Sequence, residues 1–210
     1  MLGHQRGWVM LSGRRLNNGF TLIEAIVVLA ILGLLWMVAV PSYSAYAANN
    51  SLRTTSELFY SAVQKARAEA IRRNRIVELV LTNDVPPTPA GGSMEAIDTP
   101  ISGSTSGTNW VIRAPNTAPA GTYALLDSKQ AAEAGGTKVT VNAGGVTSIQ
   151  FNGLGETTSA TAVQVQFRHI TQNAECLLTE AVRCLDVRVS PGGQARLCEP
   201  NQPLTDNRSC

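Results

Sequence analysis

The pattern of apolar and polar positions divides the chain into three parts. From Phe20 to Val40 almost every residue is apolar, and the single acid in this run is Glu24. About 20 consecutive apolar residues are enough to cross a bilayer as one helix. The pattern therefore predicts a membrane-spanning helix over residues 20–40.

The second part, residues 41–75, has the periodicity of an amphipathic helix. Apolar and small side chains recur at steps of three and four residues, and strong helix formers, above all alanine, fill the stretch. The predicted buried stripe consists of Leu52, Thr55, Phe59, Ala62, Val63, Ala66 and Ala70. We expect one helix from about Phe20 to Asn74, softly interrupted at Pro41, whose second half packs on a sheet.

The third part, residues 76–210, alternates between strand-like runs and turns. Alternation is clear in Val163, Val165 and Phe167, which have polar residues between them. Composition predicts a long loop over residues 83–109. The predicted fold class is α+β, with a long N-terminal helix packed on antiparallel β-structure. The expected strands cover residues 75–81, 110–113, 122–126, 138–143, 147–152, 161–170, 184–190 and 195–198.

Charge at the N-terminus gives the apolar run an orientation. The formal net charge of the chain is +2, and its excess lies in Arg6, Arg14 and Arg15, since no acid precedes Phe20. Arg14 and Arg15 just before the run place the N-terminus in the cytoplasm. Two simple interpretations are a cleaved signal peptide, with residues 45–47 as an A-x-A site, and a plain membrane anchor. Neither explains Glu24, because a carboxylate near the membrane centre costs about 2.5–3.5 kcal/mol.

The stretch G-F-T-L-I-E, from Gly19 to Glu24, follows a short basic leader and resembles the processing site of type IV prepilins and pseudopilins. The resemblance implies a leader over residues 1–19, cleavage by prepilin peptidase between Gly19 and Phe20, and methylation of the new amine of Phe20. It also implies a helix kink at Pro41. Glu24 would pair with the charged amine of a neighbouring subunit in the filament core, which satisfies both groups. Met1 and Met10 both remain as possible starts.

The four cysteines, Cys176, Cys184, Cys198 and Cys210, all lie in the last 35 residues. Their spacing does not fit paired zinc ligands, and an even count after a membrane-targeting segment indicates two disulfides in an oxidising compartment. Three pairings are possible. Closeness in sequence favours Cys176–Cys184 and Cys198–Cys210.

A long helix, a β-domain and a C-terminal hairpin with glycine in its turn resemble the GspH/FimT family of minor pilins and pseudopilins. The resemblance implies a type IV pilin-like fold, with residues 76–210 as a periplasmic domain and the assembled subunit in a filament tip. It implies other major and minor pilins or pseudopilins, the prepilin peptidase and the inner membrane as partners. The function it implies is that of a type IV pilus minor pilin, and the alternative is a pseudopilin of a type II secretion system.

Some FimT-like members resemble DNA receptors with a C-terminal G-R-x-R motif, which gives a second alternative. The matching residues run from Gly193 to Arg196, but Gln194 stands where the first arginine would be. A three-residue loop over 191–193 would place Val189 opposite Ala195, Val187 opposite Leu197 and Arg188 opposite Arg196. A phosphate could bridge Arg188 and Arg196, and the competing interpretation is a solvated hairpin face. Arg168 and Arg183 are further candidates for DNA contact.

An enzyme is not expected. One histidine, His169, follows the leader, and no phosphate-binding glycine loop or acid–base pair accompanies it. No metal or cofactor is expected either.

Overall fold

The computed structural model describes residues 20–87, 96–97, 101–117, 121–130, 133, 136–177 and 179–210. Gly19 and the proposed leader lie outside these residues. The chain divides into two compact units, one ending at Pro41 and the other running from Ser42 to Cys210. Each unit is described by itself below.

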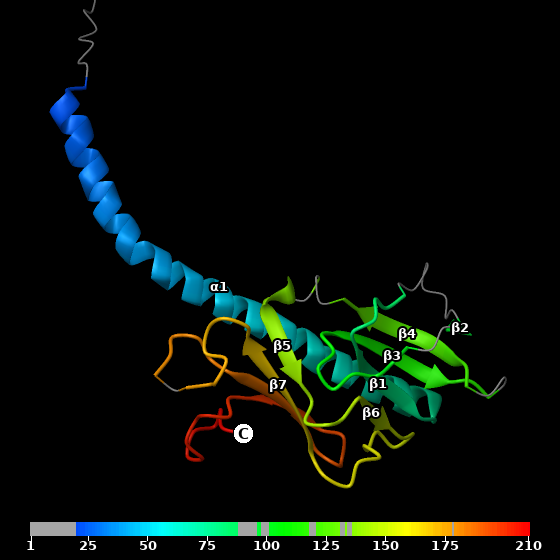
Figure 1. Cartoon of the computed structure of the whole chain (residues 1–210). Helices are drawn as coiled ribbons and strands as arrows, with labels where there is room; N and C mark the ends of the chain where they lie inside the picture. Colours follow the sequence, from blue (N-terminus) through cyan, green and yellow to red (C-terminus); the bar gives the residue numbers. More distant parts are fainter. Residues whose placement is uncertain are drawn as a thin grey trace, which may run out of the picture. The chain divides into compact units, whose positions relative to one another are not determined.

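The helix α1, Leu22–Arg73, runs through both units as one continuous element (Figure 1). Thr21 caps its start: the Thr21 hydroxyl oxygen accepts the N–H of Glu24 at 3.3 Å, and the Thr21 carbonyl accepts the N–H of Ala25 at 3.1 Å. Asn74 follows the last turn with a left-handed φ of 48°, a common way to end a helix. The prediction of one helix to about Asn74 is therefore confirmed.

Two antiparallel sheets follow α1, as Figure 1 shows. The first has the strand order β2-β4-β3-β1-β6 and the second the order β5-β7-β8-β9. The first sheet contains β1 (Val77–Thr82), β2 (Ala96–Ile97), β3 (Asn109–Pro115), β4 (Tyr123–Lys129) and β6 (Ser148–Phe151). The second contains β5 (Val139–Asn142), β7 (Val163–His169), β8 (Leu185–Val189) and β9 (Ala195–Cys198), and the short 3-10 helix η2 (Gly136–Lys138) precedes β5.

All eight predicted strands occur, within two or three residues of their expected bounds. The strand β2 was missed, because its two residues lie within the stretch predicted as a loop over 83–109 and pair with β4. Two residues are too few for an alternating pattern, so pairing with β4 rather than local sequence determines this strand. The α+β class with antiparallel sheets is confirmed.

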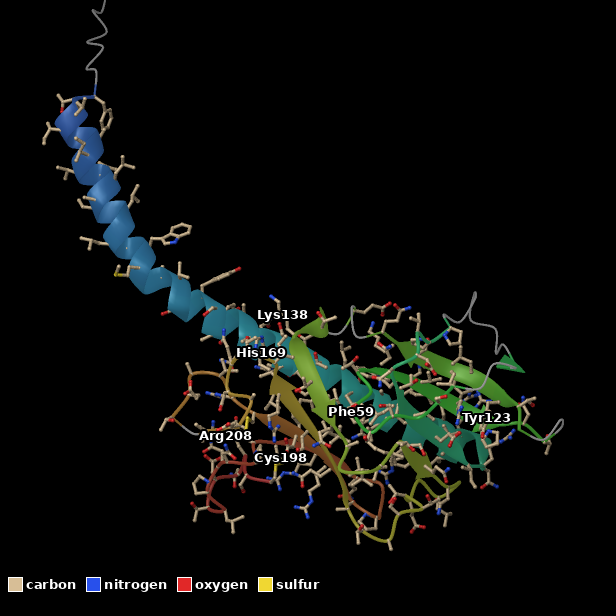
Figure 2. All side chains as sticks on the ribbon, viewed as in Figure 1. Phe59, Tyr123, Lys138, His169, Cys198 and Arg208 are labelled. Carbon is tan, nitrogen blue, oxygen red and sulfur yellow. A yellow bond between two sulfur atoms is a disulfide. The ribbon has the colours of Figure 1, made fainter. Side chains whose placement is uncertain are left out.

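One face of the second half of α1 forms the core together with both sheets. Phe59 is fully buried and lies where α1 meets the strands (Figure 2). Its ring meets Trp110 of β3 edge-on at 5.6 Å and Phe167 of β7 at 5.4 Å. Because β3 and β7 belong to different sheets, this one side chain joins them. Every member of the predicted stripe is buried: Leu52, Thr55, Phe59, Ala62, Val63, Ala66 and Ala70.

Each sheet also contains a buried ion pair. In the first sheet, Arg113 donates to Glu78 at 2.5 Å and lies over the ring of Tyr123, 3.8 Å from its centre. In the second, Arg168 donates to Asp186 at 2.6 Å, and Gln164 donates to the other oxygen of that carboxylate. Removing one partner of such a pair leaves an uncompensated buried charge, which costs about 3–5 kcal/mol.

His169 ends β7 and holds the turn that follows. Its Nδ1 accepts the backbone N–H of Gln172 at 3.2 Å and that of Thr171 at 3.4 Å. An imidazole that accepts at Nδ1 is neutral and carries its proton at Nε2. Burial, assisted by the nearby Lys138 charge, lowers the pKa of His169.

This lowered pKa predicts a loss of stability in mild acid. The unfolded state takes up a proton at pH values near the ordinary histidine pKa of 6.5, while the folded state resists protonation until its own lower pKa. We expect the free energy of unfolding to be constant above pH 6.5 with respect to this group and to fall below it. Urea unfolding of the detergent-solubilised chain between pH 5 and pH 8 measures this. The same slope in His169→Gln would contradict the assignment.

Candidate functional sites: the apolar helix and the C-terminal hairpin

The first half of α1 presents apolar side chains on all sides. Within the described residues, α1 is the helix long and apolar enough to cross a membrane, and the protein buries none of its apolar stretch. Phe20 is 77% exposed and Leu22 is 78% exposed. An apolar surface of this extent needs a bilayer or other apolar helices around it.

Glu24 lies in the first turn of this exposed helix. Its backbone N–H is bound by the Thr21 cap, and its side chain is exposed. The partial positive charge of the helix start favours a carboxylate here. In the part of the chain that the structure describes, no ion pair involves Glu24. Phe20 lies one turn before it, so the predicted cleavage point and the acid share one end of the helix.

The C-terminal hairpin of β8 and β9 has the predicted register. Val189 pairs with Ala195, Val187 with Leu197, and Arg188 with Arg196. The backbone N–H of Ser190 donates to the carbonyl of Gln194 at 2.9 Å, which closes a three-residue loop over 191–193. The register prediction is confirmed.

Gly193 of the candidate motif packs against the rest of the domain. Its φ is 72°, and a Cβ at this position would lie 1.9 Å from the carbonyl oxygen of Gly155. That oxygen accepts a hydrogen bond from Arg67 of α1 at 3.0 Å, and a second Arg67 nitrogen reaches the carbonyl of Gly192 at 3.4 Å. The glycine thus allows α1, the 152–156 loop and the hairpin to meet. Arg67 has a role that sequence reasoning missed.

The two candidate DNA-contacting arginines bind the last residues of the chain. Arg188 donates to the carbonyl oxygen of Cys210 at 2.8 Å. Arg196 donates to the carbonyls of Asn207 at 2.7 Å and Ser209 at 2.8 Å. The Cys198–Cys210 disulfide joins the end of β9 to this segment, and the backbone N–H of Glu199 donates to the carbonyl of Arg208 at 2.7 Å. Residues 199–210 therefore form a closed loop, which we call the C-terminal clasp, over the arginine pair.

The other two candidate arginines differ from each other in exposure. The Arg168 side chain is 14% exposed and belongs to the buried pair with Asp186. Arg183 is 62% exposed and lies 3.3 Å from Glu199. The structure therefore brings Arg188 and Arg196 together. The Arg168 side chain is instead bound to Asp186.

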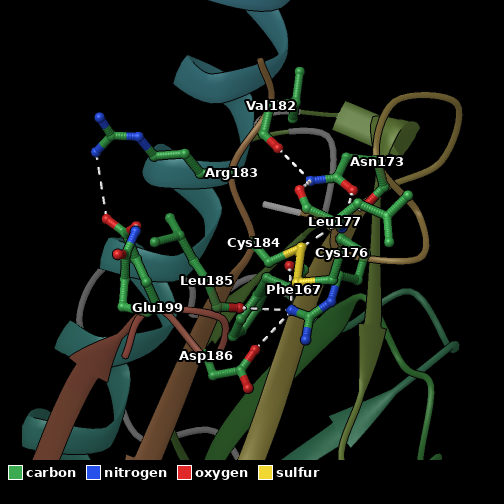
Figure 3. Close-up of a disulfide and its surroundings, with 12 residues drawn as sticks. Phe167, Asn173, Cys176, Leu177, Val182, Arg183, Cys184, Leu185, Asp186 and Glu199 are labelled. Carbon is green, nitrogen blue, oxygen red and sulfur yellow. Dashed lines mark hydrogen bonds and ion pairs between the residues drawn. A yellow bond between two sulfur atoms is a disulfide. The ribbon is translucent and has the colours of Figure 1, made fainter. Parts of the chain in front are cut away.

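The second disulfide closes the loop between β7 and β8. Figure 3 shows Cys176 bonded to Cys184, with Asn173 beside them. The Asn173 side chain accepts the N–H of Leu177 and donates to the carbonyl of Val182, each at 2.5 Å. Asn49 of α1 holds the same loop by donating to the carbonyl of Ala181 and accepting the N–H of Arg183, both at 2.9 Å. Both predicted cysteine pairings are confirmed.

A groove that the sequence did not predict lies between α1 and the edge of the second sheet. Its volume is about 490 Å³. No motif marks it, because α1 and residues 183–199 form it only after folding. Its lining includes Tyr46, Asn49 and Arg53 of α1 and Arg183, Leu185 and Leu197 of the β-domain. Within the described residues no cluster of three His, Cys, Asp or Glu side chains could hold a metal ion.

Comparisons with known proteins agree with this geometry. Residues 55–193 match the family described as "Type II transport protein GspH", and residues 14–40 match the "Prokaryotic N-terminal methylation motif". The chain is similar in fold to crystal structures of the type IV minor pilin FimU from Pseudomonas aeruginosa. In one crystal form the TM-score is 0.51 at 14% identity, covering 77% of this chain and 95% of FimU. In a second form the TM-score is 0.46, also at 14% identity, covering 73% and 94%. No curated protein matches the chain.

These matches define the class as the minor pilins and pseudopilins, structural proteins anchored in the inner membrane by an apolar N-terminal helix. The family match covers well over half of the chain, so the chain belongs to the GspH family. Members of such a family assemble with other pilins or pseudopilins.

The contact at Gly193 predicts a sharp difference between two neighbouring glycines. Gly193→Ala places a Cβ against the Gly155 carbonyl in a left-handed conformation, and we expect it to lower the free energy of unfolding by at least about 2 kcal/mol. Gly192→Ala is the matched control, because the nearest atom to its Cβ, the Ser190 hydroxyl, is 4.0 Å away. We expect the control to cost less than about 0.5 kcal/mol. Urea unfolding followed by circular dichroism compares them, and equal losses would contradict this role.

Proposed function

We propose that this chain is a minor pilin of a type IV pilus, cleaved after Gly19 and methylated on Phe20. It acts as a structural subunit, not as an enzyme, in assembly or at the tip of the filament. The observation that carries the proposal is the G-F-T-L-I-E site at the head of an uncovered apolar helix, within the matched methylation motif. Before assembly the N-terminus is cytoplasmic and the β-domain periplasmic, as Arg14 and Arg15 favour.

Charge explains the acid at position 24. Cleavage exposes the amine of Phe20, and methylation leaves its positive charge in place. Inside a bundle of apolar helices an isolated carboxylate or ammonium is costly, and two of opposite charge on neighbouring subunits satisfy each other. The exposed position of Glu24 in the first turn supports this pairing.

The helix and the disulfides fit the same proposal. Pro41 follows the apolar run and marks the end of the first compact unit, where the proposed kink lies. Two disulfides in the β-domain suit an oxidising compartment such as the periplasm.

A pseudopilin of a type II secretion system is the alternative, and the match to the family described as "Type II transport protein GspH" favours it. The two proposals share processing, anchor and fold, and they differ in the filament that the subunit joins. DNA binding by Arg188 and Arg196 stays a prediction, and a phosphate would first have to displace the carbonyls of the C-terminal clasp.

Processing at Gly19 is tested by substitution. Gly19→Val places a branched side chain next to the cleaved bond, and we expect uncut precursor to accumulate in the membrane of the native host. Gly13→Val, at another glycine of the leader, is the matched control and should be processed normally. Intact-mass measurement of the purified chain gives the cleavage point and the methyl group on Phe20. Normal cleavage of the Gly19 variant would refute the proposal.

Assembly through Glu24 is tested separately from processing. Glu24→Gln removes the charge at nearly constant size, and an unpaired buried amine then costs about 3–5 kcal/mol. We expect normal cleavage and a loss of the subunit from sheared pili on the order of tenfold or more. Immunoblotting of sheared pili and of membranes measures both amounts. If the subunit without substitution is absent from sheared pili but is recovered in the filament of a secretion system, the pseudopilin alternative is favoured.

A further inference from the structure

A second cavity lies at the end of the β-domain where α1 enters it. Its volume is about 370 Å³, within the roughly 300–1,000 Å³ typical of ligand pockets. Figure 2 shows two of its residues, Lys138 and His169, beside α1 where β5 begins and β7 ends. The lining consists of Tyr43, Ser44, Ala47 and Ala48 of α1, Lys138, and residues 169–172.

One residue of the cavity lining is close in sequence to the apolar run. Tyr43 lies three residues beyond Val40, where the apolar run ends, and both belong to the same helix. Tyr43 is 72% exposed and Tyr46 is 70% exposed. Tyrosine is enriched where a helix leaves the hydrocarbon layer, because its ring is apolar and its hydroxyl is polar.

Lys138 supplies a cation to the lining of this cavity. The chain has three lysines. Lys65 is paired with Asp127 and Lys129 with Glu133. Among the described residues no ion pair involves Lys138, whose side chain is exposed. Glu175 and Glu180 are exposed on the following loop but do not line the cavity.

An exposed apolar residue of the cavity lining is bonded to Lys138 through the backbone. Ile170 is 47% exposed, and its N–H donates to the carbonyl of Lys138 at 3.0 Å. The Nδ1 of His169 binds the backbone of Thr171 and Gln172, so the segment that carries Ile170 is held in place before any ligand arrives. A lysine, an aliphatic side chain and a tyrosine around one cavity match the phosphate, glycerol and acyl boundary of a phospholipid.

We infer that this cavity binds the headgroup of an anionic phospholipid of the membrane that anchors the unassembled subunit. Lys138 pairs with the lipid phosphate, Ile170 and Tyr43 enter the boundary between headgroups and acyl chains, and the cavity accommodates the polar headgroup. This inference rests on the proposed membrane anchoring of the unassembled subunit. It adds a second lipid contact outside the spanning helix.

Photocrosslinking in nanodiscs tests this contact with the full chain. Ile170→benzoylphenylalanine reports lipid at the cavity. Leu154→benzoylphenylalanine is the matched control, because Leu154 is an exposed aliphatic residue of the β-domain that does not line the cavity. Leu29→benzoylphenylalanine, within the apolar run, reports the bilayer contact of α1 itself. Mass spectrometry counts lipid adducts in phosphatidylethanolamine with and without phosphatidylglycerol.

We expect abundant lipid adducts at positions 29 and 170 and few at 154. Phosphatidylglycerol should increase the yield at 170, and Lys138→Gln should reduce that yield about fivefold, the effect of one basic residue near an anionic surface. Lys129→Gln, which removes a lysine of β4 that does not line the cavity, should leave the yield at 170 unchanged. Adducts at 29 without adducts at 170 would overturn this inference alone. No adducts at 29 would overturn the membrane anchoring as well. Equal yields with and without phosphatidylglycerol, or an equal effect of both lysine substitutions, would overturn the role of Lys138.

Discussion

The contact between one face of α1 and two separate sheets is the interaction on which the β-domain depends. Phe59 meets an aromatic ring from each sheet, Trp110 of β3 and Phe167 of β7. Each sheet alone would leave an apolar face in water, and burying such faces is the main favourable contribution to folding. The small side chains of Ala62, Ala66 and Ala70 in the same stripe are fully or nearly fully buried, and small residues at these positions allow the backbone of α1 to approach the strands. The helix thus serves as the shared core element as well as the anchor.

The parts of the fold that could be predicted from the sequence are mainly those in which apolar and polar side chains recur periodically. The helix stripe, the eight longer strands and the β8–β9 register follow from alternation and from a glycine-containing turn. The cysteine pairing followed from closeness along the chain. The strand β2 could not be predicted, since two residues carry no period. Arg168 shows another limit. The alternating pattern of β7 is visible in the sequence, but the buried partner of Arg168 is Asp186 on the strand β8, and this pair becomes evident only from the structure.

The candidate sites were predicted less completely than the fold, for a physical reason. Arg188 and Arg196 are opposite each other as expected, but their hydrogen-bond partners are backbone carbonyls of the C-terminal clasp. Every residue has a carbonyl, so such acceptors leave no trace in the residue types. The same applies to Arg67, which binds the carbonyl of Gly155. Glu24 was recognisable because a charge within an apolar run is itself a departure from the pattern.

The C-terminal clasp has a consequence for a subunit in a filament under tension. The Cys198–Cys210 bond spans 12 positions, and the chain between these cysteines would measure roughly 40 Å if pulled straight. A force applied at either cysteine is carried by the disulfide bond. The chain between the two cysteines is then not extended. Residues 199–209 therefore stay within one covalent ring and bear none of that force. A pull on Cys210 acts directly on Cys198, the last residue of the edge strand β9.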